Sequence, residues 1–560
     1  MTDKKKPTVV IIGAGGAAMT AAIEAAQAGA QVNVITKAIY RENDYTWGSD
    51  GGCTWKTHGF NAAVDPSDNV ESHIADTLNG GVRAANPELV SVLCHGAVEL
   101  VTWLESLGVP FSKSDSSFSS RPFGGCEVPR SVFFEDKLGF FIQKSLIEKI
   151  KKYKESIKII EGCRVIDLVK NDHDKIIGVK AMKIHTLEYI FVQADSIIIA
   201  DGGGASMYLP TAVSVDKTSD GIAMALRAGA KVIDLEFVQF HPTGIATHVP
   251  VFDGSLVEEA IRYDGARLLN KYGEQFMFNY SPTGEKSTRD IVSRGIYSEI
   301  MEKRCFDNNA VNLDVSRCKH LIKDKYPALY ERLTQAGFSP EIVSNIYVRP
   351  TAHYLMGGLL INKNTETTLE GVFCAGESSG GVHGSNRLGG NGLSEALVFG
   401  RIAGRKAAEY ALGKDASYDL ENDPIVFGSY TKSEDGFYSP DTLLNRLGND
   451  MYWHMGPIRS ETGILQMQKI LDEITDLSFR VDIGRGARAA GQIQTYISLT
   501  NLLLVSKIIC DAALQRKETR GAHYRTDYLE TDEIYRPRVY HLLHCGKIES
   551  EQLPPWSAAQ

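Results

Sequence analysis

The feature that most constrains the fold is a glycine-rich turn between a short apolar strand and an alanine-rich helix near the start of the chain. The pattern predicts a strand over Thr8–Ile12, a helix over Ala17–Ala28 and a second strand over Gln31–Thr36. The turn consists of Gly13, Ala14, Gly15, Gly16, Ala17 and Ala18. In such a βαβ unit the free N–H groups of the helix start face a pyrophosphate, so the pattern favours a dinucleotide site over an ordinary glycine turn.

Further glycine turns favour FAD over NAD. The second strand ends at Thr36 and Lys37, without the acidic residue that usually binds the ribose of NAD. A second turn occurs at Ser49–Gly52. A third follows an expected strand at Ile197–Ala200, and a fourth, at Gly376-Glu377, follows an expected strand at Gly371–Ala375. An extended cofactor enclosed by several separate loops fits FAD better.

The most unusual stretch is Val382–Leu393, which carries four glycines and a single arginine, Arg387. Glycine lets the backbone approach a ligand closely, because no Cβ stands in the way. The planar fork of arginine suits a carboxylate. We therefore expect an anion beside the cofactor.

A chain of 560 residues requires more than one core. We predict an α/β protein with a Rossmann-like FAD-binding domain, an inserted α+β capping domain and a C-terminal helical domain. The expected boundaries are 1–239 and 348–415 for the FAD-binding domain, 240–347 for the capping domain, 416–540 for the helical domain and 541–560 for an irregular tail. The helical prediction rests on apolar spacing such as Ile464, Met467, Ile470 and Leu471.

Composition limits the function classes. The net charge is −9, and no basic stripe with interleaved aromatics appears, so we expect no nucleic-acid partner. The nine cysteines form no Cys-x-x-Cys pair, so we expect no metal site, iron–sulfur cluster or haem in this chain, and a reducing, cytoplasmic setting. The apolar stretch Leu499–Leu514 contains Lys507 and Asp511, so a buried helix is expected there and no membrane span.

Polar residues cluster in segments that border the insertion. These segments are Phe240–Gly244, Leu256–Arg262, Thr288–Arg294 and Arg349–Gly358. With the glycine loops and with Arg516–Arg525, they occur in an order that resembles the flavoprotein subunit of succinate dehydrogenase and fumarate reductase, a family whose relatives include L-aspartate oxidase. The resemblance is strong over residues 8–415 and returns in the segment at 516–525.

The resemblance implies roles for individual residues. Arg289 would deliver or remove the proton on one substrate carbon, while flavin N5 exchanges a hydride with the other. Glu259 and Arg262 would carry protons between Arg289 and solvent. The implied substrate-binding residues are His241, His353, Arg387 and Glu258. The implied cofactor-binding residues are Gly13, Ala14, Gly15, Gly16, Ala17, Ala18, Thr36, Lys37, Ser49, Gly51, Gly52, Val165, Ala200, Asp220, Glu377, Asn391, Gly392, Leu393 and Ser394.

Each of these residues also has a structural interpretation when it is considered alone. His353 would more often be a structural histidine. Arg289 could form a surface ion pair that contributes at most about 1 kcal/mol. Glu258 and Glu259 could lie on a solvated helix face. The ordered set within the family resemblance favours the active-site interpretation.

Two departures from the family pattern stand out. Many members attach FAD through a histidine shortly before the second glycine turn, but the stretch Asp44–Gly52 has none. Tyr45 falls at about the expected place, and His58 lies beyond the turn, so we predict non-covalent FAD. In this family the loss of the covalent bond commonly lowers the flavin potential, which favours fumarate reduction or an oxidase-like role. Glu258 stands where the family has a threonine that binds a substrate carboxylate. Like charges repel, so either Glu258 turns away or the substrate is not a plain C4 dicarboxylate.

Three function classes follow. The leading one is an FAD-dependent oxidoreductase that interconverts a small carboxylic acid and its α,β-unsaturated form. It would pass electrons to or from an iron–sulfur partner subunit. Any contact with the inner face of the cytoplasmic membrane would be made through that partner. The second is an amino-acid oxidase like L-aspartate oxidase. The third is a non-catalytic FAD-binding electron-transfer or assembly subunit, which the presence of Arg289, Glu259 and Arg262 argues against.

Overall fold

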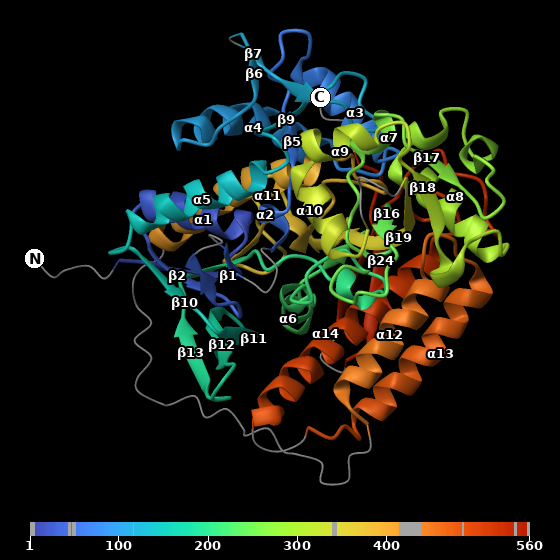
Figure 1. The fold of residues 1–560 in the computed structure, drawn as a ribbon. Helices are drawn as coiled ribbons and strands as arrows, with labels where there is room; N and C mark the ends of the chain where they lie inside the picture. Colours follow the sequence, from blue (N-terminus) through green and yellow to red (C-terminus); the bar gives the residue numbers. More distant parts are fainter. Residues whose placement is uncertain are drawn as a thin grey trace, which may run out of the picture.

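The computed structural model describes residues 6–42, 46–47, 52–115, 117–338, 344–413, 438–483, 487–542 and 546–556. Its first body is a five-stranded parallel sheet in the order β10-β2-β1-β14-β21 (Figure 1). The strands are β1 (Thr8–Ile12), β2 (Gln31–Ile35), β10 (Ile157–Ile160), β14 (Ser196–Ile199) and β21 (Val372–Cys374). The predicted α/β class with a Rossmann-like domain is thus confirmed, since β14 pairs with β1 on one side and with the distant β21 on the other.

Two helices with small residues in contact cover this sheet. α1 (Gly16–Gln27) and α11 (Asn391–Gly413) approach so closely that glycine is required at their crossing. A Cβ on Gly400 would lie 2.5 Å from the carbonyl oxygen of Ala17, and one on Gly404 would lie 2.3 Å from that of Ala21. The alanine-rich composition of α1 therefore sets how near the carboxyl-terminal half of the chain can lie to the cofactor turn.

An outer layer completes this domain. Helices α3 and α4 begin at asparagine N-caps, Asn69 and Asn86, whose side chains accept backbone N–H groups of the first turn. The remaining elements here are α2 (Gly52–Trp55), α3 (Val70–Gly80), α4 (Pro87–Ser106), α5 (Leu138–Lys151), α6 (Asp220–Arg227), β3 (Tyr40–Arg41), β4 (Thr46–Trp47), β5 (Gly59–Asn61), β6 (Lys113–Ser114), β7 (Ser117–Phe118), β8 (Ser120–Arg121), β9 (Ser131–Phe133), and the antiparallel β11 (Cys163–Lys170), β12 (Ile176–Lys183) and β13 (Tyr189–Gln193).

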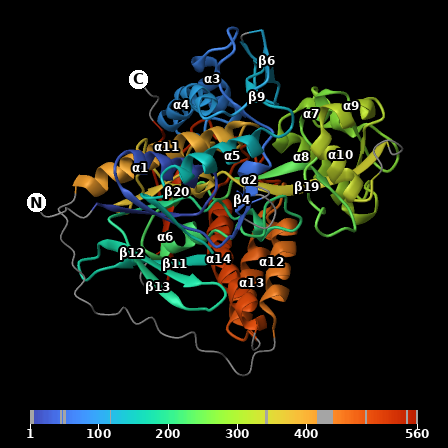
Figure 2. The ribbon, with the colours of Figure 1, turned by 60° about the vertical axis from the view of Figure 1, so that its left-hand side comes forward.

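The insertion forms a lobe to one side of the parallel sheet (Figure 2). It has its own hydrophobic core, which draws on residues from Ile245 to Val348. Its elements are α7 (Ala260–Tyr263), α8 (Arg289–Met301), α9 (Lys319–Lys325), α10 (Pro327–Gln335), β17 (Arg267–Leu269) and β18 (Val311–Asp314). Two long strands, β16 (Val238–Ile245) and β19 (Asn345–Leu355), pair with each other and join the lobe to the rest of the protein.

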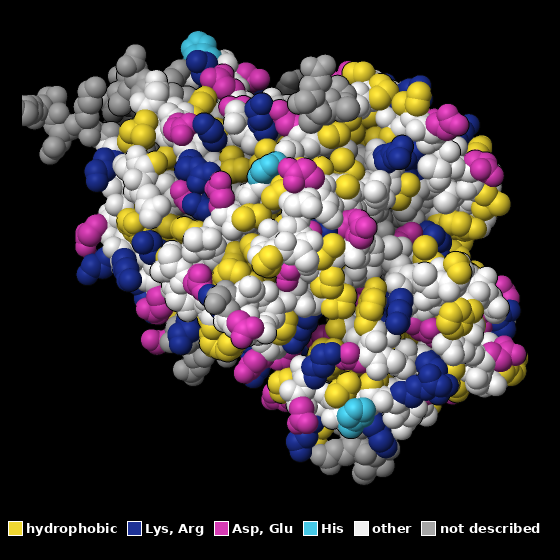
Figure 3. All heavy atoms as spheres, turned by 90° about the horizontal axis from the view of Figure 1, so that it is seen from above, with side chains coloured by type: hydrophobic (Ala, Val, Ile, Leu, Met, Phe, Trp, Pro, Cys, Tyr) yellow, Lys and Arg dark blue, Asp and Glu magenta, His cyan; other side chains and the backbone are white. Residues whose placement is uncertain are grey.

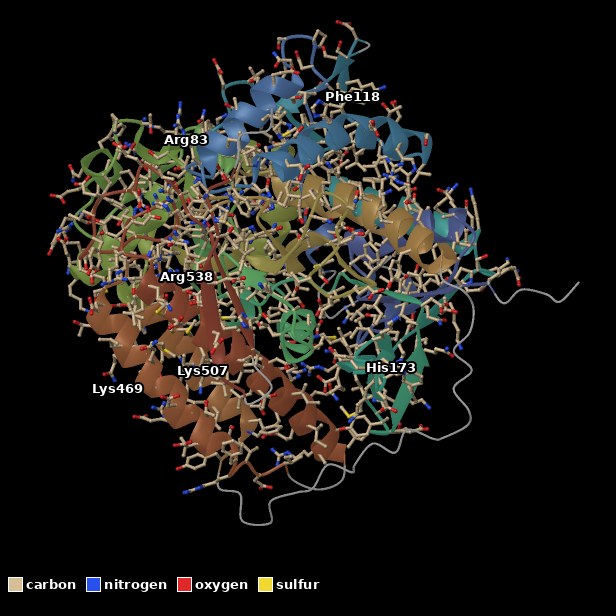
Figure 4. All side chains as sticks on the ribbon, turned by 180° about the vertical axis from the view of Figure 1, so that it is seen from behind. Arg83, Phe118, His173, Lys469, Lys507 and Arg538 are labelled. Carbon is tan, nitrogen blue, oxygen red and sulfur yellow. The ribbon has the colours of Figure 1, made fainter. Side chains whose placement is uncertain are left out.

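Three helices form the C-terminal bundle: α12 (Pro440–His454), α13 (Glu461–Ser478) and α14 (Ala487–Gln515). By length and composition alone, α4 and the Arg488–Gln515 part of α14 could cross a membrane. The apolar window of α14 is 67% buried, however, and its residues Leu499, Leu502 and Val505 belong to the core. Lys507, labelled on α14 in Figure 4, pairs with Asp472 of α13 at 3.1 Å. α14 is therefore packed as a buried helix of a bundle, as the sequence pattern predicts.

The last segment differs from the expected irregular tail. β23 (Arg538–Leu542) pairs with β24 (Ile548–Gln552) and with β15 (Val232–Ile233). The sheet has the order β22-β20-β15-β23-β24, with β20 (Gly358–Leu360) and β22 (Ser379–Gly380). Val539 and Tyr540 are buried in it, so the short apolar run of β23 is held by a distant strand that local patterning does not reveal.

Candidate active site

A cavity of about 850 Å³ extends from the glycine turn before α1 to the lobe formed by the insertion, which is called the lid lobe below. It is lined by residues of the FAD-binding domain, such as Gly13 and Gly15, and by residues of the lobe, such as Glu258 and Arg289. Both charge signs are interspersed over the molecular face drawn in Figure 3, and the cavity lining also carries both, with five arginines and eight acidic residues.

The nucleotide end of the cavity has the geometry of a pyrophosphate cradle. Gly13 has φ +109°, and a Cβ there would lie 2.3 Å from the carbonyl oxygen of Ala200. Gly15 caps α1 without a side-chain hydrogen bond, and a Cβ on it would meet nothing within 4 Å. The N–H of Gly16 donates to the hydroxyl of Thr54 at 3.0 Å, and the turn beside it lines the cavity with open space at Gly15, which fits the diphosphate of FAD.

Most of the predicted cofactor residues line this cavity. They are Gly13, Ala14, Gly15, Gly16, Ala17, Thr36, Lys37, Val165, Ala200, Asp220, Glu377, Gly392 and Leu393. Ala18 is fully buried in the core beneath the turn. Gly52 begins α2. Ser49 and Gly51, together with Tyr45, lie outside the described residues.

Asn391 and Ser394 support the cavity from behind. The side chain of Asn391 bonds to Asn61 (2.8 Å), His73 (3.1 Å) and Thr77 (3.0 Å). The hydroxyl of Ser394 donates to the carbonyl of Asn61 at 2.8 Å. Both therefore fix the start of α11, whose neighbouring backbone lines the cavity.

Two acidic residues that line the cavity, Asp220 and Glu377, are held by basic partners. Asp220 pairs with Lys37 at 3.0 Å and with Arg164 at 2.6 Å. Burial opposes ionisation, but these two cations hold the pKa of Asp220 well below its usual range. Glu377 pairs with Lys217, which sequence reasoning missed.

Arg289, at the first position of α8, lies in the cavity wall with its guanidinium held by the lobe. Its Nε donates to Oε2 of Glu259 at 2.7 Å, and its Nη1 donates to Oε1 of Gln239 at 3.1 Å. Arg262 lies behind Glu259, with its Nη2 3.6 Å from Oε1. The structure therefore brings together the three residues of the predicted proton relay, with Arg289 lining the cavity and Arg262 fully buried.

The relay carboxylate is buried yet kept charged. Burial alone would raise the pKa of Glu259, but Arg289 and Arg262 outweigh it and hold that pKa below its usual value. Burial lowers the pKa of Arg262, which eases transient loss of a proton from its guanidinium. The cluster can thus pass a proton without leaving a bare buried charge.

Two histidines and a second arginine face Arg289. The rings of His241 and His353 lie 5.7 Å apart, and burial together with the nearby arginines lowers both pKa values well below the usual value. Arg387 stacks 4.2 Å from the Tyr354 ring centre and donates to Gln239 at 2.9 Å. Burial, with Arg289 next, lowers the Arg387 pKa to about 10. The group offers hydrogen-bond donors that can hold a carboxylate.

Close backbone approach explains the glycines beside Arg387. A Cβ on Gly392 would lie 2.9 Å from Nη1 of Arg387, and a Cβ on Gly389 would lie 3.1 Å from Nη2 of Arg289. The glycine loop thus leaves room for both guanidinium groups, which accounts for the composition of this stretch.

Glu258, predicted to bind substrate, lines the cavity but is paired with protein groups. Its Oε1 accepts from Nη2 of Arg332 at 2.9 Å and lies 3.4 Å from Nε2 of His58. From the sequence, His58 was considered only as a flavin attachment point, and Arg332 and Arg121, which also line the cavity, were missed. Gln239 was missed too. It lies two residues before His241 on β16, so the two side chains share one face of the strand, and this spacing indicated it.

Comparison with known proteins agrees with this geometry. A family model described as an FAD binding domain matches residues 8–393, and one described as the fumarate reductase flavoprotein C-term matches residues 444–542. The chain is 37% identical to an uncharacterized FAD-dependent oxidoreductase of Methanocaldococcus jannaschii, covering 95% of this chain and 96% of that protein. It is 35% identical to a subunit of the fumarate reductase (CoM/CoB) of Methanothermobacter marburgensis, covering 93% and 94%.

A solved structure of a variant of Escherichia coli quinol fumarate reductase superposes with a TM-score of 0.88 at 28% identity, over 99% of this chain and 97% of that one. The fold, the cradle and the matched models define an FAD-dependent oxidoreductase. The chain belongs to the succinate dehydrogenase and fumarate reductase flavoprotein family.

Proposed function

We propose that this protein interconverts a small carboxylic acid and its α,β-unsaturated form, with Arg289 as the proton donor or acceptor. The observation that supports this most directly is the ion pair of Arg289 with Glu259, 2.7 Å long, inside the cavity that also holds the glycine turn. A surface ion pair would not be buried against a cofactor cradle.

The residues divide the work by position. Arg387, His241 and His353 would hold one carboxylate and orient the carbon–carbon bond. Arg289 would place a proton on one carbon and recover it from Glu259, with Arg262 behind. Bound FAD would supply or accept the hydride at the other carbon. The lid lobe would exclude water, which strengthens these contacts.

We propose further that FAD is bound without a covalent link and that the electrons cross to a separate iron–sulfur protein. Among the described residues, no group of three or more histidine, cysteine or acidic side chains could hold a metal ion. Relatives named fumarate reductase flavoprotein subunit support a multi-subunit assembly. Any membrane contact would then pass through the partner.

The attachment of FAD can be tested by acid precipitation of the purified holoprotein. We expect the flavin absorbance to remain in the supernatant, because the described cavity histidines are engaged elsewhere, His58 with Glu258 and the other two beside the arginines. Flavin that stays with the protein pellet would contradict this expectation.

The reaction can be tested with Arg289→Lys. This variant keeps the charge but loses the fork that meets Glu259 and Gln239, so we expect turnover with enoate acceptors to fall by about 10²-fold or more at unchanged flavin content. Viologen-linked reduction measures it, and Lys286→Arg in the same lobe is the control. Unchanged activity in Arg289→Lys, or peroxide formed from L-aspartate in air without enoate reduction, would refute the proposal.

A further inference from the structure

The outer end of the cavity contains a buried carboxylate with one oxygen left over. Glu258 is 7% exposed and lines the cavity. Its Oε1 is shared by Arg332 and His58, whereas its Oε2 is buried without a hydrogen-bond partner among the described residues. A buried acceptor without a donor is costly, so this atom is suited to a ligand group that donates a hydrogen bond.

The two ends of the cavity differ in the charged side chains that line them. The inner end has Arg289 and Arg387, with Glu259 paired to Arg289 and Glu377 paired to Lys217, so a carboxylate there would face two guanidinium groups. At the outer end the cations Arg121 and Arg332 and the acids Glu258 and Asp136 all act electrostatically on His58, and Lys56, Lys137 and Glu331 also line the cavity. The carboxylate of Glu258 would repel a second ligand carboxylate placed beside it.

Arg332 is not available to neutralise a ligand anion. Its Nη2 donates to Glu258 at 2.9 Å and its Nη1 donates to the carbonyl of Leu256 at 2.7 Å. Both ends of its fork are therefore used to hold Glu258 in place. Arg121 stacks 3.8 Å from the ring centre of Phe133, which holds its guanidinium against the cavity wall.

We infer that the substrate is a monocarboxylate whose other end carries an uncharged hydrogen-bond donor, and that this group is a carboxamide: the half-amide of an unsaturated C4 diacid. The inference rests on the proposed function. The carboxylate would lie at Arg387, and the amide N–H would donate to Oε2 of Glu258. A carboxamide also withdraws electrons from the double bond, which an ammonium or hydroxyl group on a saturated carbon does much less.

The reaction balances without touching the amide. Across the carbon–carbon double bond, one carbon gains a hydride with both electrons and the other gains a proton from Arg289. The product is the saturated half-amide. The two electrons originate from reduced FAD, which a reduced viologen dye regenerates in the assay.

The test compares fumaramate with fumarate in the purified holoprotein, with viologen as reductant. We expect kcat/KM to favour fumaramate by roughly 100-fold, because a carboxylate opposite Glu258 is repelled. Glu258→Thr and the isosteric Glu258→Gln should both lower this ratio by about tenfold or more. Glu302→Gln, which removes an exposed acid elsewhere in the lobe, should leave the ratio unchanged.

A binding measurement keeps substrate choice apart from turnover. Succinamate and succinate titrated against the oxidised flavin spectrum should show tighter binding of succinamate in the wild type and the reverse in Glu258→Thr. Equal use of fumarate and fumaramate, with no change in either Glu258 variant, would overturn the inference while leaving the proposed function intact. Reduction of neither enoate would overturn the proposed function and the inference together.

Discussion

Two buried carboxyl groups, Glu259 in the cavity wall and Glu395 of α11, take opposite charge states according to their partners. Glu259 has two arginines and stays ionised. Glu395 of α11 accepts from the hydroxyls of Ser379 (3.0 Å) and Tyr354 (3.1 Å) and lies 4.0 Å from Nε2 of His383, and burial raises its pKa to about 7. The contrast arises because a hydroxyl dipole offsets less of the desolvation of a charge than a nearby cation does.

The pH dependence of stability tests the state of Glu395. Its pKa is raised from 4.5, so between about pH 4.5 and about pH 7 the folded protein keeps a proton that the unfolded chain releases. The contribution of the Glu395 proton to the free energy of unfolding is therefore full below about pH 4.5 and is lost as the pH rises through about 7. The loss is about 3 kcal/mol. Glu395→Gln should lack this loss in urea unfolding at about pH 5 and about pH 8. Parallel pH profiles for the two proteins would contradict the assignment.

At the level of elements, the contact of α1 with α11 positions the cofactor turn relative to the arginine loop. Both helices start at the cavity, α1 after Gly15 and α11 at Asn391. Their close crossing at Gly400 and Gly404 brings the two ligand-facing ends together although they are distant in sequence. Helix–helix spacing thus sets the geometry of the site.

Gly404→Ala tests this contact. The new methyl group would lie 2.3 Å from the carbonyl oxygen of Ala21, so the helices must separate, and we expect a loss of about 1–3 kcal/mol in the free energy of unfolding. Gly491→Ala is the matched control, because a Cβ there meets nothing within 4 Å, and it should stabilise by up to about 1 kcal/mol. Thermal unfolding of both variants measures the difference, and equal effects would argue against close crossing.

For the whole molecule, Asp220 joins three separate parts. It pairs with Lys37 after β2 and with Arg164 of β11, and it accepts from Asn501 of α14 at 2.9 Å. The parallel sheet, the three-stranded sheet and the helical bundle therefore meet at one buried carboxylate that lines the nucleotide end of the cavity.

Asp220→Asn should thus affect the assembly of the domains. Removing the buried charge leaves two cations without their carboxylate partner. We therefore expect a loss of about 3–5 kcal/mol in the free energy of unfolding and weaker flavin retention. Asp167→Asn breaks a half-exposed pair with Arg227 and should cost at most about 1 kcal/mol. Denaturant titration with flavin fluorescence measures both effects. An Asp220→Asn protein as stable as Asp167→Asn would show that the junction contributes little.

Local sequence determined the elements and the identity of much of the candidate site. The βαβ unit was predictable because glycine spacing and apolar periodicity act within a few residues, and β1 has the predicted bounds. The predicted residues Arg289, Glu259, His353 and Arg387 were found through an ordered resemblance, and all four line one cavity. The domain boundaries and the individual roles stay predictions.

Tertiary structure alone decided what those residues face. No local rule places His58 and Arg332 on Glu258, because the three lie far apart in the sequence and His58 belongs to the FAD-binding domain, whereas Glu258 and Arg332 belong to the lobe. The same holds for Gln239 between two arginines and for β23 beside β15. Sequence patterns record which chemistry a chain carries; the partner of each charged group, and hence its charge state and its ligand, is set by packing between segments far apart in the chain.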